Sequence, residues 1–168
     1  ARQLRHVAGR KRDVSDAEWI AQLMQCGLLK GSFVPPPEVR HWRVLTRQRM
    51  KLLDQHTSVV NRLHKVLQQG NLKLSSVASD ILGVSGRAMI QGLINGESDA
   101  EKLADLARGR LKAPRAELVE SLEGRLTGEQ RWVLQELWEQ LEFLEGEVAR
   151  YDTQIAQQMS PYEAILGR

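Results

Sequence analysis

Several features that commonly decide a protein's class are scarce in this chain. A single cysteine, Cys26, excludes an internal disulfide framework and a cysteine-rich zinc site. Thirteen glycines and five prolines among 168 residues are too few for a low-complexity or collagen-like chain. No run of about 18 apolar residues occurs, so no membrane-spanning segment is expected. Residues 1–12 are polar and basic and lack the apolar core of a secretory signal. These absences favour a soluble, cytoplasmic protein.

Charge is present in quantity but is distributed unevenly. Residues 1–75 hold 14 Lys and Arg against 5 Asp and Glu, together with all four histidines, whereas residues 76–168 hold 10 against 16. Opposed halves of this kind indicate one end that faces nucleic acid and another that faces solvent or protein. Two ordinary charged surfaces would give the same count, so charge alone selects the end to inspect and leaves the function open.

Two long stretches repeat apolar residues at alternating steps of three and four, which predicts helices with a heptad seam. The first covers residues 38–69, contains no Pro or Gly, and would be about 48 Å long. The second covers about 127–159 and opens with a capping-box pattern at Thr127–Gln130. The first seam comprises Trp42, Leu45, Arg49, Leu52, His56, Val59, Leu63 and Val66. The second comprises Leu134, Leu137, Leu141, Leu144, Val148, Tyr151 and Ile155.

Arg49 and His56 interrupt the first seam at equivalent positions, where polar groups lower stability and can specify register or partner. Two such helices separated by a small helical cap predict an antiparallel hairpin or a coiled-coil dimer. The basic flank of the first helix is expected to complement the glutamate-rich flank of the second. That basic flank consists of Arg40, Arg43, Arg47, Lys51, Arg62 and Lys65. Any helical bundle used only for oligomerisation could show the same two seams.

The remaining segments complete an all-α fold. A capping-box pattern at Ser15–Glu18 predicts a helix over about residues 16–26, with Gly27 as its stop. The prolines that end segment 31–37 form a stiff connector, and the last of them can open the next helix. Small capping helices are expected within residues 76–122, near 76–82, 86–94, 99–107 and 114–122.

Two aspartates near the N-terminus are the clearest candidates for chemistry. Asp13 and Asp16 lie three residues apart at a predicted helix start, so their carboxylates can converge on one side of its first turn. A pair of oxygen ligands suits Mg²⁺, which takes one or two carboxylates together with waters and phosphate oxygens. The basic run Arg10, Lys11 and Arg12 would lie where a phosphate backbone approaches. On spacing alone, the simpler interpretation is that two aspartates merely favour the positive end of a helix dipole.

Other candidate sites are weaker. Residues 83–86 followed by Arg87 have the pattern of a phosphate-binding helix start, although a plain turn is the simpler interpretation. Ser85 has no general base near it in sequence, and Cys26 is expected only to pack. The histidines of the first long helix have no spacing typical of a zinc site. They are His41, His56 and His64.

At several segments the sequence resembles the DEDD transposases of the IS-one-ten type, insertion-sequence enzymes that act as RNA-guided recombinases. The similar segments are residues 10–23, 27–37, 61–67, 72–77 and 80–89. The resemblance implies an RNase-H-like (RuvC-like) domain with Asp, Glu, Asp and Asp around Mg²⁺, a helical coiled-coil domain, and a domain with a nucleophilic serine. Only the last two acidic positions map here, to Asp13 and Asp16. The first two would lie upstream of Ala1, and the serine domain would follow Arg168.

The resemblance therefore implies an internal segment of such an enzyme. Residues 1–31 would be the end of the catalytic domain, and residues 32–168 the coiled-coil domain. In the whole transposase this segment would supply part of the Mg²⁺ site, contacts to DNA and guide RNA, and assembly into a dimer or tetramer. By itself it is expected to be inactive.

Two rival functions belong to other classes. A coiled-coil interaction protein without nucleic-acid chemistry would have no reason to carry the residue 10–19 block. A helix-turn-helix regulator would need a basic recognition helix, and residues 86–94 hold a single arginine.

Overall fold

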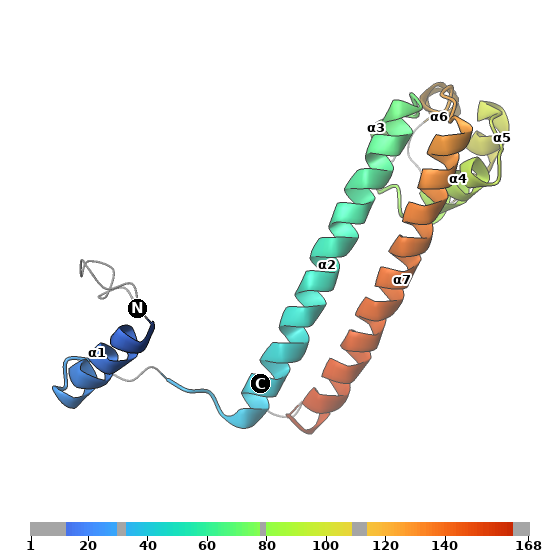
Figure 1. Ribbon diagram of the computed structural model, residues 1–168. Coiled ribbons are helices and arrows are strands. Elements are labelled where there is room, and N and C mark those ends of the chain that lie inside the picture. The colour runs from blue at the N-terminus through green and yellow to red at the C-terminus, as the bar shows by residue number, and fades with distance from the viewer. Residues whose placement is uncertain (1–12, 30–32, 78–79, 109–113, 163–168) are drawn as a thin grey trace. The chain divides into compact units, whose positions relative to one another are not determined.

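The computed structural model describes residues 13–29, 33–77, 80–108 and 114–162, which contain helices and no strand. The chain divides into two units, Ala1–Arg40 and His41–Arg168. Figure 1 labels the helices in chain order. The all-α fold predicted from the sequence is confirmed for these residues.

The first unit contains helix α1, Asp13–Gln25. It begins three residues before the predicted start, so Ser15 lies inside the helix and the predicted capping box does not open it. Residues 13–15 include neither Pro nor Gly, so nothing in them stops the helical hydrogen bonding. Gly27 ends the helix as predicted. Its φ of +68° lets the backbone turn, and the Leu28 N–H donates to the Leu23 carbonyl at 3.0 Å.

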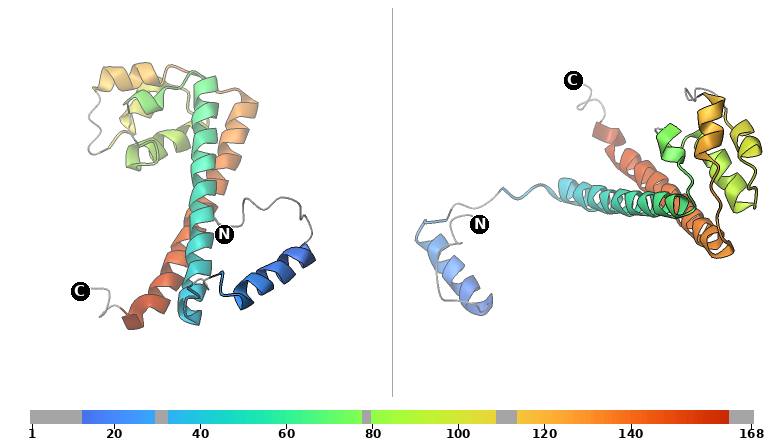
Figure 2. Two further views of the ribbon diagram at one scale, coloured as in Figure 1. Left: turned by 90° about the vertical axis from the view of Figure 1, so that its left-hand side faces the viewer. Right: turned by 90° about the horizontal axis from the view of Figure 1, so that it is seen from above.

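The second unit is built on a hairpin of two long helices. Helix α2 covers Pro37–Gln69 and helix α7 covers Gly128–Met159. Both agree with the predicted ranges to within one residue. Pro37 is the first residue of α2, and the predicted capping box opens α7: Gln130 N–H donates to the Thr127 hydroxyl, and the Gln130 side chain accepts from Thr127 N–H at 2.9 Å. Figures 1 and 2 show the two helices side by side.

The heptad seams form the interface of this hairpin, but they are buried unequally along it. Apart from the half-buried His56, the seam is buried from Leu52 onward in α2 and as far as Leu144 in α7. Toward the other end, Leu45, Tyr151 and Ile155 are only half-buried. The difference arises because a cap of small helices covers one end of the hairpin and none of the described residues covers the other in the same way.

The cap consists of four short helices inserted between α2 and α7. They are α3 (Leu74–Val77), α4 (Val84–Ile94), α5 (Ala100–Asp105) and α6 (Arg115–Ser121). Helix α4 packs on α7 and on α5, while α6 packs on α3 and α5. Each helix overlaps its predicted range, and Asp99 caps α5 by accepting from the Glu101 N–H at 3.0 Å. A final 3₁₀ turn, η2 (Ser160–Tyr162), follows α7.

Backbone hydrogen bonds close the cap at its neck, where the chain leaves α2 and returns to α7. The Arg125 N–H donates to the Gly70 carbonyl and the Lys73 N–H to the Ser121 carbonyl, each at 2.8 Å. A Cβ at Gly124 would lie 2.2 Å from the Gly70 oxygen, so the two backbones approach as closely as they do only because residue 124 has no side chain. Among the described residues, no helix is long and apolar enough to cross a membrane.

Candidate nucleic-acid interface

The first polar residue of the α2 seam, Arg49, is paired with Asp152 of α7. The Arg49 guanidinium contacts both carboxylate oxygens, with Nη2 at 3.2 Å from Oδ2. This hydrogen-bonded contact holds the pKa of Asp152 below its ordinary value and raises the pKa of Arg49. Arg49 is therefore engaged within the hairpin.

The second polar seam residue, His56, meets Glu145 of α7, with 3.4 Å between His56 Nε2 and Glu145 Oε1. The same carboxylate oxygen accepts from Arg87 of helix α4 at 2.5 Å. The Arg87 guanidinium also lies 5.5 Å from the centre of the Trp138 ring, in cation–π geometry. Glu145 thus joins α2, α7 and the cap.

The sequence left open whether Arg49 and His56 specify the register of the hairpin or the choice of a partner, and their contacts bear on this question. Arg49 and His56 are seven residues apart on α2, and their partners Asp152 and Glu145 are seven residues apart on α7. Both polar seam residues are therefore paired within one chain, where they can specify the antiparallel register.

The six predicted nucleic-acid contacts of α2 have a different environment. All six side chains are exposed: Arg40, Arg43, Arg47, Lys51, Arg62 and Lys65. We call these six residues the basic stripe. At about 100° per residue, their spacing places them on one face of α2 about 100° wide. Arg49 follows Arg40 by nine residues, which is half a turn around the helix, so the stripe is centred on the face of α2 opposite the seam.

This placement corrects the expectation that the basic flank pairs with the glutamates of α7. Among the described residues, no ion pair involves any member of the stripe, and those across the hairpin come from Arg49 and His56. Asp54 is the one acidic residue in the sequence between positions 40 and 65. The stripe therefore presents uncompensated positive charge to solvent.

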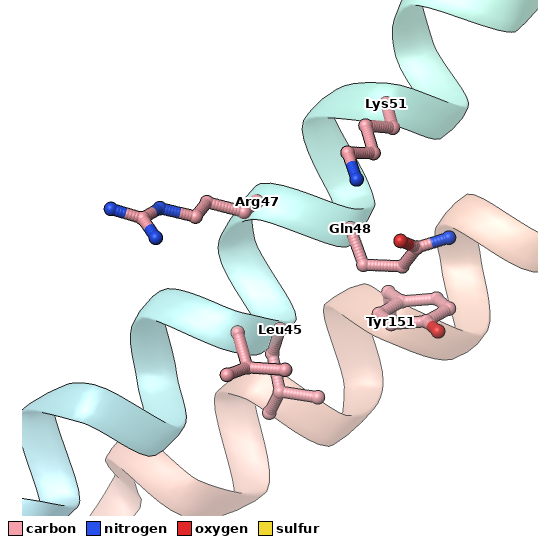
Figure 3. Close-up of a pocket in the computed structure, with 6 residues that line it drawn as sticks. Leu45, Arg47, Gln48, Lys51 and Tyr151 are labelled. Atoms are coloured by element: carbon pink, nitrogen blue, oxygen red, sulfur yellow. The ribbon is translucent and has the colours of Figure 1, made fainter. Parts of the chain in front are cut away.

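A shallow groove of about 430 Å³ lies between α2 and α7 beside the stripe (Figure 3). Its lining combines apolar side chains, two stripe cations, an amide and a phenol. These residues are Val44, Leu45, Arg47, Gln48, Lys51 and Tyr151. In Figure 3, Lys51 is turned toward the amide of Gln48, which lies by the ring of Tyr151, whereas Arg47 extends away from the helix. The heptad pattern placed Tyr151 only in the apolar seam, and no local sequence signal indicated this groove.

The acidic candidates lie in the first unit. Asp13 is the first residue of α1, and Asp16 is exposed in its first turn. The side chain of Asp13, and all of Arg10, Lys11 and Arg12, lie outside the described residues. Within the described part of the chain, no group of three or more His, Cys, Asp and Glu side chains could hold a metal ion. Two carboxylates at this spacing are compatible with a shared Mg²⁺, which accepts as few as one or two protein ligands.

The weaker candidates have structural explanations. A Cβ at Gly86 would lie 2.1 Å from the Ile81 carbonyl oxygen, so this glycine permits close packing at the start of α4. Ser85 donates to the Arg108 carbonyl at 2.7 Å and accepts from its N–H at 2.8 Å. With Arg87 held by Glu145, the turn interpretation of residues 83–87 fits the geometry. Cys26 is exposed, which corrects the expectation that it packs.

Comparison with known proteins gives one match. The family model DEDD_Tnp_IS110, described as a transposase, matches residues 1–71. The match covers α1 and α2 completely and ends where the chain turns from α2 into the cap. No curated protein and no solved structure shows significant similarity to the chain.

Proposed function

Because residues 1–71 of this chain match the model of the IS110-type transposase family, we propose that the chain acts within a DNA transposase. In that enzyme, DNA cleavage and strand exchange are directed by a guide RNA. The segment contributes nucleic-acid backbone contacts, part of an acidic Mg²⁺ site and the assembly of protomers.

The observation that carries the proposal is the exposed basic stripe within the matched region. Arginine and lysine side chains aligned on one helix face can contact successive phosphates and release the counterions condensed on them. The stripe lies half a turn from the hairpin interface, so phosphate contacts would not disturb the pairs made by Arg49 and His56. Because none of the stripe residues forms an ion pair with a described residue, their charges remain available to phosphates.

The acidic part of the proposal involves Asp13 and Asp16. In this family divalent metal is generally used, and these two carboxylates at the start of α1 would supply two of its oxygen ligands. A bound Mg²⁺ supplies stabilisation of negative charge that develops on phosphate oxygens. The aspartates themselves would hold such an ion at the start of α1.

A second function remains open, in which the chain is a coiled-coil interaction module without nucleic-acid chemistry. The observation in its favour is a set of exposed apolar side chains on the long helices: Val44, Met50, Trp132 and Phe143. The helix-turn-helix alternative has less support, because the one arginine of α4, Arg87, is held by Glu145 and stacked on Trp138.

The experiment that separates these functions removes charge from the stripe. In a filter-binding assay with duplex DNA and with structured RNA, Arg43→Ala combined with Arg47→Ala should weaken binding. Each lost phosphate contact should lower the slope of log K against log salt by about 0.9 for duplex DNA, giving a reduction of about one to two units. Thermal stability should barely change, because neither arginine has an ion-pair partner among the described residues.

A matched control removes the same charge elsewhere. Lys102→Ala combined with Arg150→Ala eliminates two exposed cations that lie outside the stripe and pair with nearby glutamates. Binding by this control should keep the original salt slope. If the stripe variant unfolds tens of degrees lower and binds as before, the stripe is structural and the interaction-module function is correct.

The acidic site is tested in a complete transposase that contains this segment. Asp13→Ala or Asp16→Ala should abolish recombination and leave folding intact, because a single carboxylate at a helix start contributes little to stability. The 168-residue chain alone should show no nuclease activity with Mg²⁺, because two carboxylates bind this ion weakly. Retained recombination in either variant would remove that aspartate from the site.

A further inference from the structure

We propose that the groove between α2 and α7, lined by Arg47, Gln48, Lys51 and Tyr151, accepts an unpaired base of the nucleic acid that the basic stripe holds. The proposal rests on the proposed function, because the stripe must first bind the phosphate backbone. It adds a preference that the stripe alone cannot supply, which is discrimination between fully paired and locally unpaired strands.

The groove and the stripe share two residues. Arg47 and Lys51 belong to the stripe and also line the groove, so a backbone held by these cations would pass directly along its edge. They are four residues apart, which is about 6 Å along the helix. A nucleotide held at this edge therefore has its base within reach of the groove.

The lining has the chemistry that a base requires. The ring of half-buried Tyr151 offers an aromatic face, and the side chains of Val44 and Leu45 provide apolar walls. The exposed Gln48 amide carries both a donor and an acceptor for the polar edge of a base. A single strand is bound in this manner by many proteins, through cations along its backbone and an aromatic side chain on which a base stacks.

The size and openness of the site favour a base over a larger ligand. A volume of about 430 Å³ is at the lower end of the range for small-molecule sites. The groove opens beside the cations Arg47 and Lys51, so a partner that occupies it should carry negative charge next to its bound group. A glutamate-rich helix of a second copy would also carry negative charge, and the test below identifies that occupant.

The test compares a short hairpin RNA that has one unpaired base in its stem with the same hairpin fully paired, and repeats the comparison with DNA. The chain should bind the form with the unpaired base about five- to tenfold more tightly, which corresponds to the lower part of the range for one base–aromatic stack. The RNA and DNA arms show which strand the groove prefers.

Variants of the two tyrosines provide matched controls. Tyr151→Leu keeps an apolar side chain in the hairpin but removes the aromatic face, so the preference should disappear while binding to the paired form is unchanged. Tyr151→Phe should retain the preference. Tyr162→Leu should retain it as well, because Tyr162 lies outside the groove and packs edge-on against Trp42, with 4.9 Å between ring centres.

A covalent readout identifies the contact directly. A 5-iodouracil at the unpaired position should crosslink to Tyr151 on irradiation, and the crosslinked peptide is identified by mass spectrometry. This result stands even if Tyr151→Leu fails to fold, because it uses the unmodified chain.

The outcomes separate the two proposals. Binding that depends on Arg43 and Arg47 but shows no preference for the unpaired base, or a crosslink at another residue, overturns the groove proposal and leaves the proposed function in place. Absence of binding to every nucleic acid overturns both. Tyr151→Leu that lowers self-association and leaves nucleic-acid binding unchanged assigns the groove to a second copy.

Discussion

Arg49 and His56 are polar residues in an apolar seam, and each has an acidic partner on the facing helix. The pairs Arg49–Asp152 and His56–Glu145 are one heptad apart on both helices. A shift of α7 by one heptad would place Arg49 opposite Glu145 and leave Asp152 without a partner. Polar seam residues of this kind specify register at some expense in stability. The sequence indicated that role, and the structure supplies the partners.

The Arg49–Asp152 pair has a specific pH dependence. The guanidinium lowers the pKa of Asp152 in the folded state, so the pair contributes stability above the unfolded pKa of about 3.9 and loses it as pH falls through the lower folded value. Asp152→Asn should therefore lower the melting temperature at pH 7. The difference from wild type should shrink below about pH 4.

Thermal denaturation followed by circular dichroism at several pH values measures this difference. Glu136→Gln is the control, because Glu136 is an exposed carboxylate of α7 outside the ion pairs of the described residues. A gap between wild type and Asp152→Asn that stays constant from pH 7 to pH 3 would show that the charge of Asp152 does not contribute.

At the scale of the elements, two glycines illustrate opposite demands on the backbone. Gly124 lies in the neck of the cap, where an added Cβ would overlap the backbone of Gly70 and Asn71. Gly146 lies in the middle of α7, is exposed, and has nothing within 4 Å of the position of a Cβ. Gly124 is required because two chain segments approach each other closely there. Gly146 lies within a continuous helix, and no neighbouring atom requires a glycine at that position.

Substitution of each glycine by alanine should therefore change stability in opposite directions. Gly124→Ala forces two backbone segments apart and should destabilise the chain by about 1–3 kcal/mol. Gly146→Ala should stabilise it by roughly 0.5–1 kcal/mol, since alanine loses less conformational entropy in a helix. Chemical denaturation of both variants measures the free energies of unfolding. A loss of stability in Gly146→Ala would mean that the outer face of α7 is packed against another protomer.

The helix boundaries show where the local sequence was enough to predict the start of an element. Pro37 and the Thr127–Gln130 capping box mark the starts of α2 and α7, because proline and capping side chains act within a single turn. The predicted start of α1 at residue 16 was wrong by three residues. Residues 13–15, which precede the predicted start, are themselves compatible with a helix and form its first residues. Helix α3 begins at Leu74, two residues before the predicted start at 76, and residues 80–82 at the predicted end are not helical.

At the scale of the whole molecule, the outer face of α7 carries two exposed aromatic side chains. Trp132 and Phe143 are 62% and 63% exposed and lie eleven residues, or three turns, apart. Each is nine residues from a buried seam leucine, Leu141 and Leu134 respectively, so both point away from α2. Together with the half-buried end of the seam, they support the proposed association of protomers.

Light scattering of the chain at tens of micromolar should therefore give a mass of at least twice the 19.0 kDa of one chain. Phe143→Ser should shift this mass toward that of a single chain. Val84→Ser, which alters another exposed apolar residue in the cap, should leave it unchanged. A monomer at this concentration would contradict the predicted oligomer.

Much of the architecture was determined by the sequence alone. Heptad periodicity, capping residues and the absence of Pro and Gly from residues 38–69 predicted both long helices, because these signals act between neighbours along the chain. The resemblance at segments in residues 10–67 was confirmed by the family match over residues 1–71, whereas the segments at 72–77 and 80–89 lie beyond that match. The roles of Asp13, Asp16 and the basic residues stay predictions.

Only the tertiary structure decided which charges meet. The sequence placed basic and acidic flanks on two helices and predicted that they pair, but pairing depends on how each helix is rotated about its axis. Burial of the apolar seam turns Arg49 and His56 toward α7 and directs the basic stripe outward. The same packing creates the groove beside Tyr151 and brings Arg87 to Glu145 across 58 residues of sequence. Contacts between residues so far apart in the chain have no local signal, because they follow from the hydrophobic surface that the fold buries.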